Sequence, residues 1–162
     1  LFGATHRDLL ESLVVVSGAS EPTPPERQRM FMQLAEIGKT KGMAEVAEHR
    51  KSMGQLPKKV VEDERIWKLF RDDLYAKTSV KGFEGAATAL GKFKAFTDKL
   101  DQIRVPTLVI CGEQDVNFLP QVEVIQRKIK KIKVVTMQGC GHFPMLEKPR
   151  EFIQTISRFI EK

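Results

Sequence analysis

Two side chains that can move protons together, Asp115 and His142, each follow a short hydrophobic run in the sequence. An imidazole titrates near neutral pH, so it can take the proton of a weak nucleophile. A carboxylate on the other ring nitrogen fixes the tautomer and stabilises the cation that forms. The pair therefore supplies two of the three parts of a nucleophile–histidine–acid triad, provided that the fold brings the two side chains together.

A buried strand is predicted directly before Asp115. Residues 105–111 form an apolar run, rich in β-branched residues, that stops at Gly112. This pattern is typical of a parallel strand covered on both faces, and Pro106 is tolerated near the start of such a strand. The loop that follows would present Asp115 at the carboxyl end of the strand, where the sites of open α/β sheets form.

A second strand, predicted over residues 133–137, leads through a glycine-rich segment to His142. Residues 120–131, between the two strands, repeat apolar side chains at helical spacing. Strand, helix and strand together predict a βαβ unit whose parallel strands end at the same edge of the sheet. We therefore predict that Asp115 and His142 are hydrogen-bonded directly or through one water.

The same runs resemble the C-terminal half of an α/β-hydrolase-fold enzyme. The resemblance is most specific from Asp98 onward and is carried by Leu100-x-x-Ile103-x-Val105-Pro106-Thr107-Leu108-Val109-Ile110-x-Gly112-x-x-Asp115 and by Gly141-His142-Phe143-Pro144-x-x-Glu147-x-Pro149. It implies an α/β fold class: a partial α/β-hydrolase fold with parallel strands at one end of the sheet and an inserted all-helical cap. It also implies the chain order nucleophile, acid, histidine, with Asp115 as the acid and His142 as the base.

The resemblance further implies a carboxylesterase-like hydrolase that acts on small-molecule esters. The nucleophile elbow is expected upstream of Leu1, so we expect the chain alone to be inactive. Because the nucleophile could be serine or aspartate, lactonase, epoxide hydrolase, dehalogenase and C–C hydrolase activities stay open. A hydrolase-derived module that binds a small molecule or a protein partner without catalysis is the remaining alternative. No cofactor and no metal is expected.

The predicted domain division follows a change in periodicity. Residues 13–16 predict a buried strand, whereas residues 23–96 have the helical period throughout. By resemblance, residues 1–22 and 97–162 form the C-terminal part of the hydrolase core, and residues 23–96 form a helical cap, or lid. A final helix is predicted from Pro149, with one apolar face toward the sheet: Phe152, Ile153, Ile156, Phe159 and Ile160.

Four helices are predicted in the cap segment. The first has a capping box at Thr23 and ends at Gly38; the second covers residues 40–53 and ends at Gly54. The third carries Ile66, Trp67, Phe70 and Leu74. The fourth runs through Phe83 to Phe93, and its three glycines indicate close packing against a neighbour: Gly82, Gly85 and Gly91.

Other reactive residues have simpler interpretations. Ser20 follows a strand, but prolines follow it where an elbow needs a helix, so we interpret the segment as an exit loop. The two cysteines, Cys111 and Cys140, are predicted to be buried and reduced. Glu147 is interpreted as a structural carboxylate near a helix N-terminus.

Composition restricts the class of partner. The chain has 162 residues, with 41% hydrophobic and 30% charged residues, as in one ordinary globular domain. Its net charge is +6 and its densest basic run covers residues 127–133. We interpret that run as a solvated helix end and predict no nucleic-acid partner, because stacking aromatics and a binding motif are lacking. We also expect no membrane association and a cytoplasmic location, since neither a membrane span nor a secretory leader is recognisable.

The expected partners are therefore a small-molecule substrate and a strand that pairs with residues 13–16. This strand would form an apolar sheet edge without proline or charge to block pairing. We expect it to pair with the missing N-terminal half of the fold or with a second copy of the chain.

Overall fold

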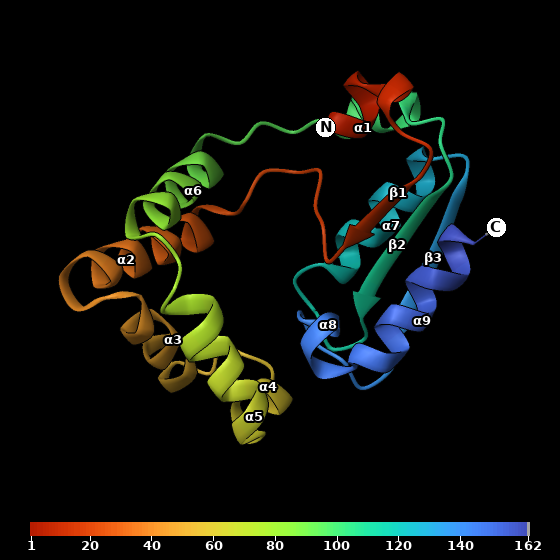
Figure 1. Cartoon of the computed structure of the whole chain (residues 1–162). Helices are drawn as coiled ribbons and strands as arrows, with labels where there is room; N and C mark the ends of the chain where they lie inside the picture. Colours follow the sequence, from red (N-terminus) through yellow and green to blue (C-terminus); the bar gives the residue numbers. More distant parts are fainter. Residues whose placement is uncertain (162) are drawn as a thin grey trace. The chain divides into compact units, whose positions relative to one another are not determined.

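The computed structural model describes residues 1–161, which form two compact units. One unit combines Leu1–Glu21 with the chain from Ala95 onward, and the other is Pro22–Lys94. We call them the sheet unit and the helical unit (Figure 1). Each is described here by itself.

The sheet unit is built on three parallel strands in the order β1-β2-β3 (Figure 1). These are β1 (Leu13–Val16), β2 (Thr107–Gly112) and β3 (Ile132–Met137). In register, Leu13 lies opposite Thr107, which lies opposite Ile132. Every residue of the central strand β2 is buried, as its continuous apolar run predicted. All three predicted strands are therefore confirmed.

Helices cover both faces of this sheet. One face packs against α1 (Phe2–Thr5), the 3₁₀ helix η3 (Thr97–Gln102) and α7 (Leu119–Lys128), through Ala4, Leu100, Val122 and Ile125. The other face packs against α9 (Pro149–Ile160) through Phe152, Ile156 and Phe159. A short 3₁₀ helix, η1 (Arg7–Leu9), precedes β1, and α8 (Pro144–Glu147) precedes α9.

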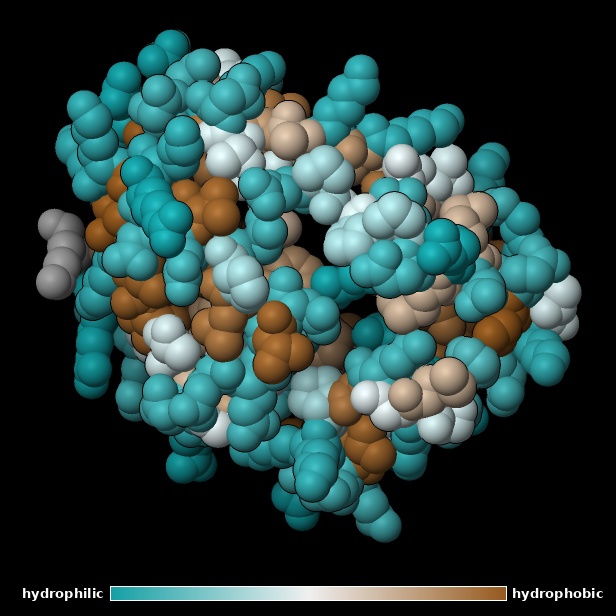
Figure 2. Space-filling view, turned by 180° about the vertical axis from the view of Figure 1, so that it is seen from behind, coloured by the Kyte–Doolittle hydropathy of each residue, from teal (hydrophilic) through white to brown (hydrophobic). Residues whose placement is uncertain are grey.

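The predicted apolar face of α9 is correct only in part. Ile153 and Ile160 are 61% and 63% exposed, whereas both were expected to face the sheet. Apolar residues extend around more of this helix than the three strands cover. Hydrophobic residues also reach the surface elsewhere on both units (brown in Figure 2).

The helical unit contains α2 (Pro25–Lys41), α3 (Met43–Ser52), α4 (Lys58–Glu62), α5 (Glu64–Lys68), the π-helix η2 (Leu69–Tyr75) and α6 (Val80–Lys92). Its core is formed by Leu34, Met43 and Val46, with Tyr75 and Phe83 packed against them. The third predicted helix is thus two consecutive elements, α5 and η2, and α4 was not predicted. Within residues 1–161, no helix is long and apolar enough to cross a membrane.

Two predicted helix boundaries in this unit are wrong. The helix α2 continues past Gly38 to Lys41, because Gly38 is buried beside Met43 and Gly42, with φ of 90°, ends the helix instead. The second helix, α3, therefore begins at Met43 rather than at residue 40. The predicted capping box also fails, since Pro24 is the N-cap of α2 and no side chain caps it.

The glycines of α6 do not mark a tight helix contact. A Cβ at Gly85 would meet no atom within 4 Å, and at Gly91 it would meet Gln28 only at 3.6 Å. Close approach occurs instead at Gly38, where a Cβ would lie 2.8 Å from the Met43 sulfur. A glycine in a helical pattern thus signals packing only where another element is in reach.

We expect the isolated chain to self-associate through β1. In the part of the chain that the structure describes, β1 pairs only with β2. The N–H of Leu13 donates to the carbonyl of Pro106, just before β2, and the N–H of Ser17 donates to a carbonyl within β2. Because N–H groups point alternately to the two sides of a strand, those of Val14 and Val16 face the free edge. Sedimentation at micromolar concentration should therefore show dimers or larger species.

Val16→Pro provides a matched variant for this prediction. Proline removes an N–H from the free edge and leaves the bonds to β2 intact. The variant should shift the population toward monomer. A folded wild-type monomer at the same concentration would contradict the edge-pairing argument.

Candidate active site

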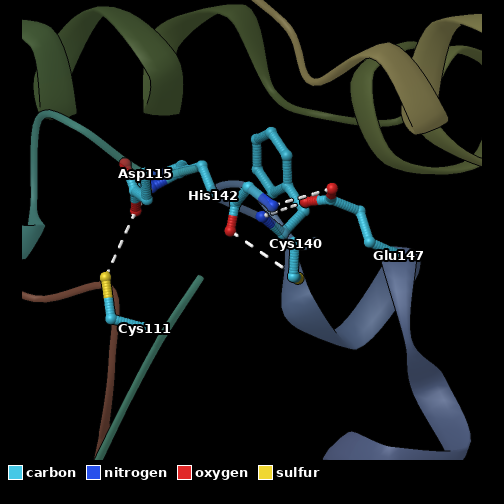
Figure 3. A network of polar contacts seen from close by, with 7 residues as sticks. Cys111, Asp115, Cys140, His142 and Glu147 are labelled. Atoms are coloured by element: carbon cyan, nitrogen blue, oxygen red, sulfur yellow. Dashed lines mark hydrogen bonds and ion pairs between the residues drawn. The ribbon is translucent and has the colours of Figure 1, made fainter. Parts of the chain in front are cut away.

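Asp115 and His142 are hydrogen-bonded, as predicted from their places after consecutive parallel strands. His142 Nδ1 lies 2.8 Å from Asp115 Oδ2 (Figure 3). The Asp115 side chain is 4% exposed and that of His142 is 34% exposed. A buried carboxylate thus holds one ring nitrogen, while solvent reaches part of the imidazole.

The turn after β2 fixes Asp115. Its N–H donates to the Gly112 carbonyl over 3.1 Å, and its own carbonyl accepts from Phe118 and Leu119 N–H. These bonds join the end of the strand to the start of α7. The carboxylate is therefore carried by a short, hydrogen-bonded turn between two packed elements.

The loop that carries His142 is bonded directly to this turn. The N–H of Gln114 donates to the Cys140 carbonyl over 2.9 Å, and Gly139 N–H donates to Glu113 Oε2 over 2.8 Å. Gly139 has φ of 59°, which bends the chain after β3. The two loops are thus hydrogen-bonded to each other at the carboxyl edge of the sheet.

Glu147 holds the histidine loop from its other side. Its carboxylate accepts the N–H of Gly141 over 2.9 Å and the N–H of Phe143 over 3.0 Å (Figure 3). The residue is 2% exposed. Glu147 holds backbone, in line with its structural interpretation, but it does not cap α9, whose N-terminus has no side-chain cap. It is the last residue of α8, and its hydrogen bonds to the histidine loop were not predicted.

Two aromatic rings contact the imidazole. The Phe118 and Phe143 ring centroids lie 4.6 Å and 5.0 Å from that of His142. Neither was predicted as a site residue. Their places in the sequence give a weak indication of this contact, since Phe143 adjoins the histidine and Phe118 follows the Asp115 turn.

Neither cysteine is placed to act as a nucleophile. Neither forms a disulfide, and both are fully buried. The Cys111 thiol lies behind Asp115, with 3.9 Å from Sγ to Oδ2, and burial together with the Asp115 charge raises the pKa of Cys111 to about 11. The Cys140 thiol is directed at the Gly141 carbonyl over 3.8 Å rather than at the imidazole.

Ser20 is a core residue. It is fully buried, and its hydroxyl is hydrogen-bonded to that of Thr97 over 2.8 Å. This agrees with its interpretation as part of an exit loop. Among residues 1–161, no three His, Cys, Asp or Glu side chains are grouped so that they could hold a metal ion.

We expect Gly112→Ala to displace the histidine loop. A Cβ at this position would lie 2.1 Å from the Gly141 carbonyl oxygen and 2.2 Å from that of Cys140, and both are backbone atoms held by other bonds. Overpacking of a core typically costs about 1–3 kcal/mol, so we expect the upper end of that range or more. Chemical denaturation measures the free energy of unfolding.

The control for this variant is Gly85→Ala in α6. A Cβ there has open space and replaces a helical glycine, so the variant should gain about 0.5–1 kcal/mol. Equal effects of the two substitutions would refute the proposed loop contact.

A family model described as "Alpha/beta hydrolase family" matches residues 3–155. Among curated proteins, the chain is 31% identical over 67 residues to a proline iminopeptidase of Lactobacillus helveticus (41% of this chain, 23% of that protein). It is 33% identical over 89 residues to 3-oxoadipate enol-lactonase 1 of Acinetobacter baylyi (53% and 32%). The aligned part is thus a minor share of these relatives' length.

Solved structures match almost the whole chain. A thermophilic esterase from Thermogutta terrifontis superimposes with a TM-score of 0.82 at 24% identity, over 99% of this chain and 59% of that one. An enol-lactonase from Burkholderia xenovorans gives 0.82 at 21% identity, over 99% and 60%. The chain therefore spans about three fifths of these structures.

Proposed function

The chain belongs to the alpha/beta hydrolase family, and we propose that the protein of which it forms part hydrolyses carboxylic esters of small molecules. The partial α/β-hydrolase fold predicted from the sequence is confirmed. In our proposal Asp115 is the acid and His142 the base of a triad whose nucleophile comes from another segment of the protein. We also propose that residues 23–96 are the cap and that the protein works in a reducing, cytoplasmic environment.

One observation carries the proposal: the 2.8 Å bond between a buried carboxylate and a partly exposed imidazole. The bond fixes the Nδ1–H tautomer, which leaves Nε2 as the acceptor. Nε2 takes the proton of the nucleophile as that oxygen attacks the ester carbonyl. The resulting imidazolium is stabilised by Asp115.

The imidazolium then returns its proton to the leaving alkoxide, so that an alcohol departs and an acyl-enzyme remains. Water then attacks the acyl carbon while His142 takes one of its protons. The bond between the acyl carbon and the nucleophile oxygen breaks, the imidazolium returns the proton to that oxygen, and the carboxylic acid is released. The developing oxyanion needs two backbone N–H donors. In this fold one belongs to the residue after the nucleophile and the other to the loop that follows an earlier strand. In our proposal both donors, like the nucleophile, come from another segment of the protein.

Lactone hydrolysis is the second candidate. It is favoured by the 89-residue match to the enol-lactonase, which is longer than the match to the iminopeptidase. A lactone is a cyclic ester, so Asp115 and His142 would do the same work and the alcohol would stay attached to the product.

A substrate panel tests the proposal. The whole protein is assayed with p-nitrophenyl butyrate, a small aliphatic lactone and L-proline p-nitroanilide. We expect the nitrophenyl ester to be hydrolysed with kcat/KM well above that of the anilide. Preference for the lactone would favour the second candidate, and no turnover of any acyl substrate would favour a non-catalytic binding module.

A further inference from the structure

Glu147 is a buried carboxylate that takes no part in the proton transfers described above. We propose that it is a positioning residue, which sets the place of His142 by binding the backbone on both sides of it. The inference rests on the proposed function, because it concerns the same base.

The geometry is that of a two-point clamp. One carboxylate oxygen accepts the N–H of Gly141, and the other accepts the N–H of Phe143. These residues are the two immediate neighbours of His142. Since the carboxylate is planar and rigid, the two bonds fix the peptide groups before and after the histidine relative to each other (Figure 3).

The clamp is itself anchored. Glu147 N–H donates to the Phe143 carbonyl over 2.9 Å, which closes a one-turn helix, α8, between the histidine loop and α9. The helix α9 packs on the sheet through Phe152 and Ile156. The carboxylate of Glu147 is thus anchored, through α8 and α9, to the same sheet that carries Asp115.

The histidine loop needs such an anchor. It contains Gly139 and Gly141, which leave the backbone more freedom than other residues would. Bonds from N–H groups to a carboxylate are shorter and stronger than those to neutral acceptors. A catalytic group displaced by about 1 Å can lose about 100-fold in rate, so a loose loop would weaken the Asp115–His142 pair.

Glu147→Gln in the whole protein tests the proposal. The amide keeps the shape of the side chain but has only one acceptor oxygen, so its NH₂ would face one of the two N–H donors. We expect kcat for p-nitrophenyl butyrate to fall about 10- to 100-fold with KM within about twofold. The downfield proton signal of His142 Nδ1–H should also move or broaden.

Glu151→Gln is the matched control. Glu151 lies four positions later on α9, is exposed, and forms an ion pair with Lys148 over 3.4 Å. This variant removes the same charge close by and should leave kcat and the Nδ1–H signal unchanged. An equal loss in both variants would show that charge, not the clamp, is responsible, and would overturn the proposal.

The outcomes separate this inference from the proposed function. If His142→Ala is inactive while Glu147→Gln keeps kcat within about twofold, the clamp is wrong and the proposed base stands. If His142→Ala keeps its activity, the proposed function itself fails. Should Glu147→Gln not fold, hydrogen exchange in the wild type decides: the N–H groups of Gly141 and Phe143 should exchange at least about 100-fold more slowly than unprotected loop amides, and exchange at the unprotected rate would overturn the clamp.

Discussion

His142→Ala is expected to lower kcat for ester hydrolysis by the whole protein about 10⁵- to 10⁶-fold. The alanine cannot take the proton of the nucleophile, and it leaves the Asp115 carboxylate buried without the imidazole it holds. What remains is the rate supplied by substrate binding and by the oxyanion donors. Single-turnover kinetics with a nitrophenyl ester measure the loss.

His49→Ala is the control for this variant. His49 lies on α3 in the helical unit and its side chain is exposed. Its replacement should change kcat less than about twofold, as for surface substitutions generally. If His142→Ala kept more than about one hundredth of the wild-type kcat, another group would have to be the base.

The strands and the Asp115–His142 pair could be predicted from sequence because each rests on a local signal. The four residues before Gly112 are all apolar, a pattern typical of a strand that is buried on both faces. The acid follows this strand within three residues, and the base follows the next strand, β3, after a short glycine-rich loop. Parallel pairing then brings them to one edge whatever the details of the loops.

Features that depend on distant partners could not be predicted in this way. Gly38 has the sequence pattern of a helix stop, yet it lies inside α2 because Met43 packs against it. Ile153 has the spacing of a core residue, but its side chain is 61% exposed, whereas Phe152 and Ile156 beside it pack on the sheet. The contacts of Glu147 depend on how α8 folds back on the histidine loop, and no local spacing encodes that.

The role of the acid is tested most sharply by Asp115→Asn, for which we expect a loss of about 10⁴-fold in kcat. The asparagine has nearly the same shape, so the loops should keep their bonds: the hydrogen bonds with Gly112 and Phe118 are made by the backbone of this residue. Its NH₂ group can take the position of Asp115 Oδ2, which lies 2.8 Å from His142 Nδ1 and 3.9 Å from the Cys111 sulfur. Nδ1 would then accept, and the ring proton would move to Nε2.

A histidine that carries its proton on Nε2 cannot take another from the nucleophile, so the base is present but in the wrong tautomer. The nitrogen chemical shifts of His142 should report that change while the thermal midpoint stays close to that of the wild type. Asp101→Asn, at an exposed position of η3 in the same unit, should alter neither the shifts nor kcat. If Asp115→Asn kept kcat within about tenfold with the Nδ1–H tautomer retained, the buried carboxylate would not be what orients the base.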